Sequence, residues 1–186
     1  MIWLRALSFV IAVQLTVVGI IPWLLARVGP RLPMGGWHWL AIVPLTIGAF
    51  ALLWCNWAFV MRGRGTAAPY DPPRELVVQG LYRHVRNPMY VSAFLILMGL
   101  GVWTGAVSVF LYSLLLALSY HLFVRFYEEP HLQRVFGQSY AEYCAGVPRW
   151  WPRLTAWQRL SNLDTVSTGS GSDLVSDQHA SFPNDS

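Results

Sequence analysis

The residues best suited to chemistry lie in one short polar stretch, Gly-Leu-Tyr-Arg-His-Val-Arg-Asn-Pro-Met-Tyr, at residues 80–90. Asn87 fits the N-cap of a helix and Pro88 fits its first turn, so the stretch predicts a helix that begins there. The unpaired backbone N–H groups and the positive dipole end of such a helix attract anions, and Arg86 adds a full positive charge beside them. The pattern therefore predicts a site for an anionic group, such as a carboxylate or a phosphate.

Two adjacent carboxylates, Glu128 and Glu129, come directly after a long apolar run. At the C-terminal end of a helix they would meet the negative end of its dipole, which is an unfavourable placement. The two glutamates are therefore candidates for a site at the membrane edge, where they would meet the positive charge of Arg86. A structural role is the alternative: a salt bridge between Arg86 and one of the glutamates, or Glu129 as the cap of the following helix.

The elements that must position these residues are membrane helices. The chain is 55% hydrophobic and only 12% charged, and its mean hydropathy of +0.42 is high for a soluble domain. Three apolar stretches are long enough to cross a bilayer: residues 6–26, 37–60 and 89–127. The third is long enough for two helices with a turn at residues 101–105. A cleaved signal peptide is the alternative for the first stretch, but no small-x-small site follows it.

The sequence thus predicts an all-α integral membrane protein with four transmembrane helices. All 13 basic residues are arginine, and with the N-terminus inside, eleven of them fall inside and only Arg27 and Arg31 outside. Positive charge favours the cytoplasmic side, so both termini and residues 61–86 are expected there, in a bacterial inner membrane. Because the last two helices form a hairpin, Arg86 is expected to lie near the two glutamates.

The chain is expected to have three parts. Residues 1–60 are a transmembrane hairpin that serves as scaffold. Residues 61–160 hold the chemistry: a Pro-rich loop, two transmembrane helices, and an amphipathic helix at the cytoplasmic interface after Pro130. Residues 161–186 are rich in Ser, Thr, Gly and Asp, and are expected to be a disordered tail.

Neither metal nor nucleic acid is expected as a partner. Cys55 and Cys144 should lie at different depths, and no pair of histidines has the spacing of metal ligands. The net charge of +4 is explained by membrane topology and by anionic lipid head groups, without nucleic acid.

At these residues the sequence resembles the isoprenylcysteine carboxyl methyltransferase and phospholipid N-methyltransferase superfamily of membrane enzymes. The resemblance runs from about residue 65 to residue 153 and depends on the order of several short motifs. These motifs are Glu75-Leu76-Val77, Gly80-x-Tyr82, Arg86-x-Pro88-x-Tyr90, the Glu128-Glu129 pair, Phe136-Gly137-x-x-Tyr140-x-x-Tyr143 and Val147-Pro148. Each motif is weak alone, and together they are specific.

The resemblance implies a methyltransferase that uses S-adenosyl-L-methionine and a lipophilic or lipid acceptor. It implies that the cofactor is bound by Leu76, Val77, Tyr82, Asn87, Pro88, Tyr90 and Glu128. Arg86 and Glu129 are then the catalytic candidates, with Glu129 as the available base for an amine acceptor. Two positions depart from the eukaryotic pattern: Asn87 replaces a histidine, and Arg125 is only the nearest equivalent of the substrate arginine.

The residues are compatible with this cofactor. A sulfonium ion favours aromatic faces such as those of Tyr82 and Tyr90, and a glutamate can accept hydrogen bonds from ribose hydroxyls. The acceptor expected first is the carboxylate of an isoprenylcysteine-like substrate, and a phospholipid head-group amine is the alternative. A non-catalytic membrane protein that binds a lipophilic ligand or serves assembly is a further alternative, and a membrane reductase is less favoured because the chain is short.

Overall fold

The computed structural model describes residues 11–62, 76 and 78–158, and these are almost entirely helical. The elements are η1 (Leu15–Ile20), α2 (Ile21–Leu25), η2 (Gly35–Ala41), α3 (Ile42–Arg62), η3 (Gly80–Arg83), α4 (Pro88–Thr104), α5 (Val107–Phe123), η4 (Val124–Glu128), α6 (Glu129–Phe136) and α7 (Gln138–Gly146). The described part contains one isolated bridge, between Arg31 and Ala106, and no β-strand. The predicted all-α class is confirmed there, whereas most of the Pro-rich loop and the expected tail at residues 161–186 lie outside the described residues.

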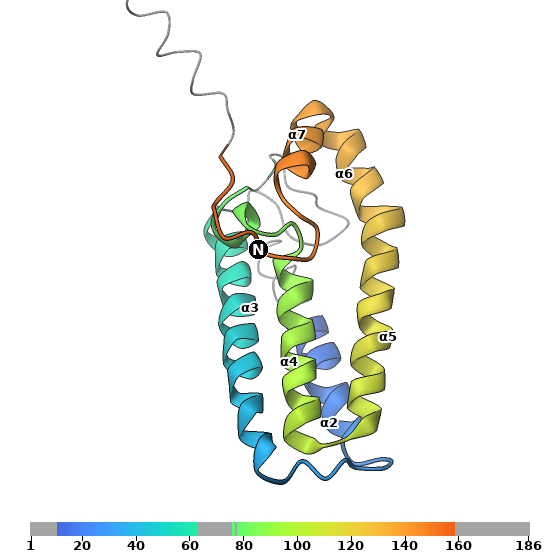
Figure 1. The fold of residues 1–186 in the computed structure, drawn as a ribbon. Coiled ribbons are helices and arrows are strands. Elements are labelled where there is room, and N and C mark those ends of the chain that lie inside the picture. The colour runs from blue at the N-terminus through green and yellow to red at the C-terminus, as the bar shows by residue number, and fades with distance from the viewer. Residues whose placement is uncertain (1–10, 63–75, 77, 159–186) are drawn as a thin grey trace, which may run out of the picture.

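Several elements join end to end into four longer helices that run antiparallel between two ends of the molecule (Figure 1). Two of them, Gly35–Ala58 and Val107–Phe136, are long and apolar enough to cross a membrane, while Ile11–Leu25 and Pro88–Thr104 are shorter apolar helices. Only 17% of each long apolar window is buried within the protein, so neither is the core helix of a soluble fold. The lipid is the natural cover for these faces.

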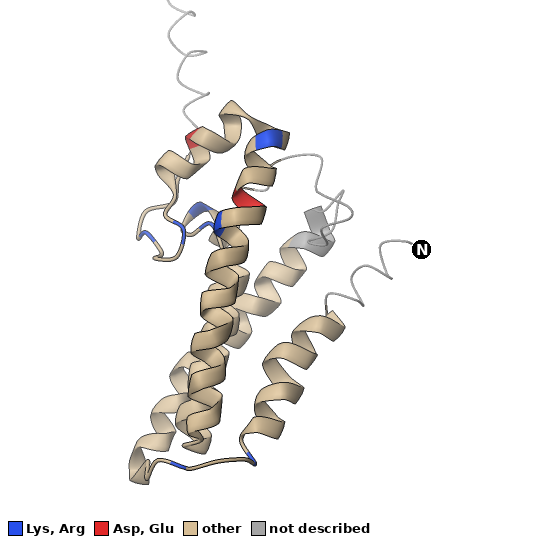
Figure 2. Cartoon of the chain, turned by 90° about the vertical axis from the view of Figure 1, so that its right-hand side faces the viewer, with Lys and Arg blue, Asp and Glu red and all other residues tan. Residues whose placement is uncertain are grey.

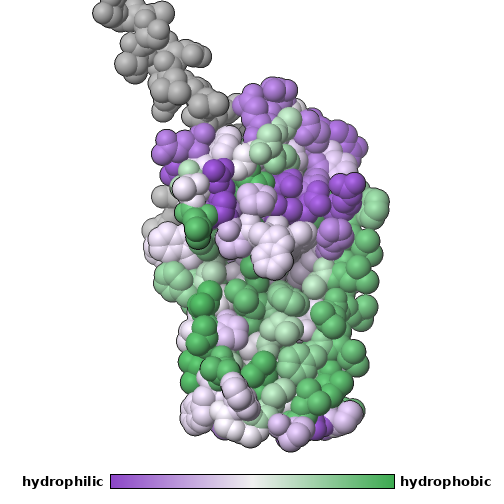
Figure 3. Space-filling model, viewed as in Figure 1, coloured by the Kyte–Doolittle hydropathy of each residue, from purple (hydrophilic) through white to green (hydrophobic). Residues whose placement is uncertain are grey.

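The surface is divided into an apolar middle and polar ends, as expected for helices that cross a membrane. On the face that Figure 3 shows, hydrophobic residues form a broad band across the middle of the bundle, and hydrophilic residues gather at the end that carries α6 and α7. Among the residues that the structure describes, the charged ones lie at the two ends and not along the middle of the bundle (Figure 2). Exposed leucines along α5 belong to the hydrophobic band, namely Leu111, Leu114, Leu115 and Leu118. The described part is therefore that of a membrane protein.

Helix α4 lies between α3 and α5 and packs closely on α3 because of small residues (Figure 1). A Cβ atom at Gly48 would lie 2.8 Å from the backbone oxygen of Ser92, and one at Gly99 would lie 2.7 Å from Cγ of Leu45. Such contacts leave no room for a methyl group. Close backbone approach through small residues is a common way in which membrane helices associate.

Gly48→Ala is therefore expected to destabilise the α3–α4 pair by roughly 1–3 kcal/mol, as overpacking of a tight contact does. Thermal unfolding of the detergent-purified protein would measure this loss. Gly19→Ala in η1 is the matched control, because nothing lies within 4 Å of a Cβ atom there. Equal unfolding temperatures for the two variants would contradict the close packing of α3 on α4.

The turn between α4 and α5 is shorter than the predicted turn at residues 101–105. Helix α4 continues to Thr104, and Gly105 ends it in the left-handed region with φ 66°. The Gly105 N–H donates to the Gly101 carbonyl at 2.8 Å, and α5 begins at Val107. One left-handed glycine reverses the chain, so the longer loop is unnecessary.

The prediction that Glu128 and Glu129 end a helix is wrong. Helix α5 continues through the π-helical turn η4 into α6, which ends before Gly137 with φ 51°. Pro130 lies in the first turn of α6, and its ring and missing N–H disturb an α-helix. The wider π-turn before it accommodates the proline without a break. The expected interfacial helix is consequently divided: α6 extends α5, and only α7 turns away from it (Figure 1).

Candidate functional site

The candidate site lies at the hydrophilic end of the bundle, where η3, the start of α4, α6 and α7 meet. Tyr140 and Tyr143 of α7 form a small buried core with Val147, which directly follows that helix. Leu76, one of the expected cofactor residues, packs against this core, and so do Leu132 and Phe136 of α6. Val77, its expected partner in cofactor binding, lies outside the described residues. This packing sets the position of α6 and α7 relative to the start of α4.

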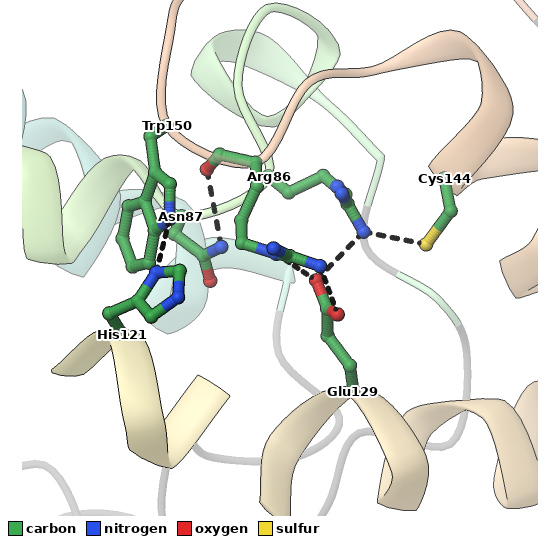
Figure 4. Close-up of polar contacts among 7 residues, drawn as sticks. Arg86, Asn87, His121, Glu129, Cys144 and Trp150 are labelled. Carbon is green, nitrogen blue, oxygen red and sulfur yellow. Dashed lines mark hydrogen bonds and ion pairs between the residues drawn. The ribbon is translucent and has the colours of Figure 1, made fainter. Parts of the chain in front are cut away.

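Three charged side chains meet at the centre of the site (Figure 4). Arg86 donates from Nη1 to Oε1 of Glu129 at 2.9 Å, and Arg149 donates to both oxygens of the same carboxylate at 2.7 Å. The side chains of Arg86 and Glu129 are 13% and 15% exposed, so the pair is largely removed from solvent. The salt bridge that the sequence left as an alternative is present, with Glu129 as the partner.

The guanidinium groups of Arg86 and Arg149 share the single carboxylate of Glu129, so the cluster carries a net positive charge. Arg86 also donates from Nη1 to Sγ of Cys144 at 2.8 Å. Its Nε is buried and has no hydrogen-bond partner among the described residues. A buried guanidinium N–H without a partner is unfavourable, so the site is suited to an anionic acceptor at this atom.

Glu128 faces a different set of side chains from Glu129. Its Oε2 accepts a hydrogen bond from the Tyr90 hydroxyl at 2.9 Å. The ring of Tyr90 lies against that of Tyr120 on α5, with centroids 4.5 Å apart. The structure thus places a carboxylate beside two aromatic rings at the membrane end of the site, which is the composition that a cation favours.

Tyr82 joins this group from η3. Its carbonyl accepts a hydrogen bond from the Tyr143 hydroxyl at 2.7 Å. Burial raises the pKa of the Tyr82 phenol well above its usual range, and the nearby Cys55 and Tyr143 raise it further. The negative charge of Glu128 acts in the same direction. Tyr82 is therefore a neutral hydroxyl at physiological pH and lies in the same electrostatic environment as Glu128.

The sequence predicted that the side chain of Asn87 caps α4, but in the structure it makes no capping hydrogen bond. Its Nδ2 instead donates to the Arg149 carbonyl at 3.2 Å, while Pro88 does occupy the first turn of the helix. The reason is tertiary: residues 147–157, here called the return segment, fold back against the loop before α4 and offer their own carbonyls. The first N–H groups of α4 consequently receive no cap from Asn87.

Three residues of the site were missed by the sequence reasoning: Arg149, Tyr120 and Trp150. Arg149 was only one of the eleven arginines expected on the cytoplasmic side, although it directly follows the Val147-Pro148 motif, which was the available signal. No sequence signal pointed to Tyr120, because tyrosines are common in membrane helices. Trp150 donates from Nε1 to Nδ1 of His121 at 3.2 Å and ties the return segment to α5 (Figure 4). Among the described residues, no three His, Cys, Asp or Glu side chains lie close enough to hold a metal ion.

The chain is similar to three known proteins. It is 29% identical over 131 residues to the nickel-cobalt-cadmium resistance protein NccN of Alcaligenes xylosoxydans xylosoxydans, covering 66% of this chain and 56% of that protein. It is 35% identical over 65 residues to the phosphatidylethanolamine N-methyltransferase of Schizosaccharomyces pombe, covering 35% of this chain and 7% of the enzyme. The enzyme of the same name from Yarrowia lipolytica is 32% identical over 79 residues, or 42% of this chain and 8% of the enzyme.

The chain thus spans about half the length of NccN and less than a tenth of each yeast enzyme. No solved structure matches it significantly. Residues 37–139 match the phospholipid methyltransferase family, and this range runs from η2 to α7 and includes Arg86, Glu128 and Glu129. Because the match covers more than half of the 186 residues, the chain belongs to the phospholipid methyltransferase family.

Proposed function

We propose that the chain is an S-adenosylmethionine-dependent methyltransferase embedded in the membrane, and that its acceptor is the amine of a phospholipid head group. Membership of the family supports methyl transfer, and the names of the two yeast relatives support phosphatidylethanolamine as the acceptor. The observation that carries the proposal is the unpaired Nε of Arg86. It lies at the start of α4, where the methionine carboxylate of the cofactor would find a donor and a positive helix end.

The other expected cofactor residues support the same placement. Tyr90 and Tyr120 would provide aromatic faces for the sulfonium. Glu128 accepts one hydrogen bond from Tyr90, and a carboxylate can accept several, so ribose hydroxyls or the cofactor amino group can share it. The loop before α4 would contact the cofactor through Tyr82, Asn87 and Pro88. Leu76 and Val77, which precede these residues in the chain, would contact it as well.

The chain's main contribution to the reaction would be alignment. S-adenosylmethionine, when bound, supplies a methyl group that is open to in-line attack, and its sulfur keeps the electron pair of the broken bond. Holding the acceptor nitrogen in line and excluding water lowers the barrier without covalent catalysis. The amine must lose a proton to a base. Glu128 is the candidate for that base, because it is the carboxylate beside the expected sulfonium position. Glu129 was the candidate base from sequence, but its hydrogen bonds to Arg86 and Arg149 favour a positioning role.

The membrane arrangement belongs to the same proposal. Four spans, with both termini and the site in the cytoplasm of a bacterial cell, agree with the four antiparallel helices. They also agree with Arg27, which lies just after α2, and with Arg31, which pairs with Ala106 at the turn between α4 and α5, the end opposite the site. Residues 1–60 would anchor the protein, residues 61–160 would form the methyltransferase part, and residues 161–186 would be a tail outside the chemistry. The acceptor lipid would approach laterally from the bilayer.

The test is lipid analysis by mass spectrometry in a bacterial host that contains phosphatidylethanolamine and makes no methylated derivatives. Expression of the chain is expected to produce N-methylated phosphatidylethanolamine, and Glu128→Gln is expected to produce none. Methyl esterification of an isoprenylcysteine analogue, without methylated lipids, would instead support the carboxyl acceptor. Folded protein that binds no S-adenosylmethionine and methylates neither acceptor would contradict the proposal.

A further inference from the structure

The return segment holds the loop that leads into α4. Backbone hydrogen bonds join Arg86 N–H to the Pro148 carbonyl at 2.9 Å and Arg153 N–H to the His84 carbonyl at 3.0 Å. Arg149 lies between these two bonds, and its carbonyl accepts from Asn87 at 3.2 Å. Segments more than 60 residues apart in the chain are thus paired side by side, directly over the first turn of α4.

The side chain of Arg149 determines how Glu129 is oriented. Its Nε and Nη2 donate to the two carboxylate oxygens at 2.7 Å each, a paired geometry that fixes the plane of the carboxylate. These hydrogen bonds raise the pKa of the Arg149 guanidinium. Arg86 donates to one of the same oxygens, so its orientation depends on a carboxylate that Arg149 holds.

We infer that Arg149 is a positioning residue of the proposed methyltransferase site, an inference that rests on the proposed function. Through Glu129 it holds the Arg86 guanidinium, with its unpaired Nε, at the start of α4. Through its carbonyl it holds the side chain of Asn87. Lysine cannot replace it fully, because one ammonium group cannot make the two parallel hydrogen bonds. The site is therefore complete only when the return segment is folded back.

Cofactor binding and kinetics separate this role from a merely structural one. Arg149→Ala and Arg149→Lys are both expected to raise the Kd and KM for S-adenosylmethionine about tenfold, as the loss of one charge-assisted contact does. For Arg149→Lys, the unfolding temperature is expected to stay near that of the wild type. Arg134→Ala is the control, since Arg134 is exposed on α6 and donates to Pro130 of its own helix. Unchanged Kd and KM together with reduced stability would indicate a structural role and overturn the inference.

A double-variant comparison tests the route through Glu129. If Arg149 acts through that carboxylate, Arg149→Ala combined with Glu129→Gln should weaken cofactor binding no more than the stronger single substitution. Additive losses would mean that Arg149 acts independently of Glu129. That outcome would overturn the proposed route.

Amide hydrogen exchange gives a readout that does not depend on the cofactor. Arg149→Ala is expected to accelerate amide exchange at residues 83–87 and 147–157 and to leave exchange in α3 unchanged. Arg134→Ala should leave exchange unchanged in all three regions. If the wild type bound no S-adenosylmethionine, the proposed function would fail, and exchange would still decide whether Arg149 holds the loop. If the wild type bound it and Arg149→Ala changed neither binding nor exchange, the inference on Arg149 would fail while the proposed function stood.

Discussion

Glu128→Gln is expected to weaken S-adenosylmethionine binding about ten- to a hundredfold, the cost of losing one charge-assisted hydrogen-bond acceptor. Glutamine is nearly the same size as glutamate and still accepts from the Tyr90 hydroxyl, which is 2.9 Å from the carboxylate. The substitution removes the negative charge beside the expected sulfonium position. Methyl transfer should fall at least as far as binding, because the same charge also aligns the methyl group. Calorimetry on the detergent-purified protein measures the binding.

The matched control is Glu142→Gln, which removes the same charge from an exposed position on α7. It should leave cofactor binding unchanged. Tyr90→Phe keeps the aromatic face and removes the hydroxyl, so its loss should be smaller than that of Glu128→Gln. Glu128→Gln protein that binds the cofactor like the wild type would remove Glu128 from the site and favour a non-catalytic membrane protein.

Arg86→Ala is expected to reduce methyl transfer by about a hundredfold or more, since it removes both a cofactor donor and the positive charge at the start of α4. The protein should also lose roughly 1–3 kcal/mol of unfolding free energy, because a partly buried charged hydrogen bond is broken. Glu129 keeps its two bonds to Arg149, so it is not left as an unpaired buried charge. Steady-state kinetics and thermal unfolding measure the two effects.

Arg86→Lys distinguishes charge from geometry in this prediction. Lysine keeps the charge, so stability should recover in part, but it has no equivalent of the unpaired Nε. Cofactor binding should therefore remain weak. Arg134→Ala serves again as the control for the loss of an arginine. If Arg86→Lys restored binding to the wild-type level, the charge alone would matter and the proposed contact through Nε would be wrong.

The sequence indicated the right elements because their signals are local. Apolar stretches of membrane length predicted the long helices, and Asn87-Pro88 predicted where α4 begins, since both patterns depend on neighbouring residues. The motif order predicted the family, which the match over residues 37–139 confirms. The hairpin of the last two apolar helices placed Arg86 near the glutamates, and the 2.9 Å contact with Glu129 follows from that topology.

The partners of the polar groups were decided only by the tertiary structure. The sequence could not choose between Glu128 and Glu129 as the partner of Arg86, because the two are adjacent and the choice depends on the rotation of the helix that carries them. The π-turn η4 sets that rotation, directing Glu129 to the arginines and Glu128 to Tyr90. A π-turn has no clear sequence signature of its own.

The contacts of the return segment are the second feature that only the tertiary structure decided. Arg149 lies 20 residues from Glu129 and 62 residues from Asn87 in the chain, and it contacts both. Contacts over such distances arise from tertiary packing, in which α6 and Leu76 pack against the buried residues Tyr140, Tyr143 and Val147, and not from local preference. The residue types and helix lengths that suit a membrane methyltransferase are thus present in the sequence alone. The pairing of its charges is decided by the fold, because burial forces each polar group to take a partner that the fold brings near.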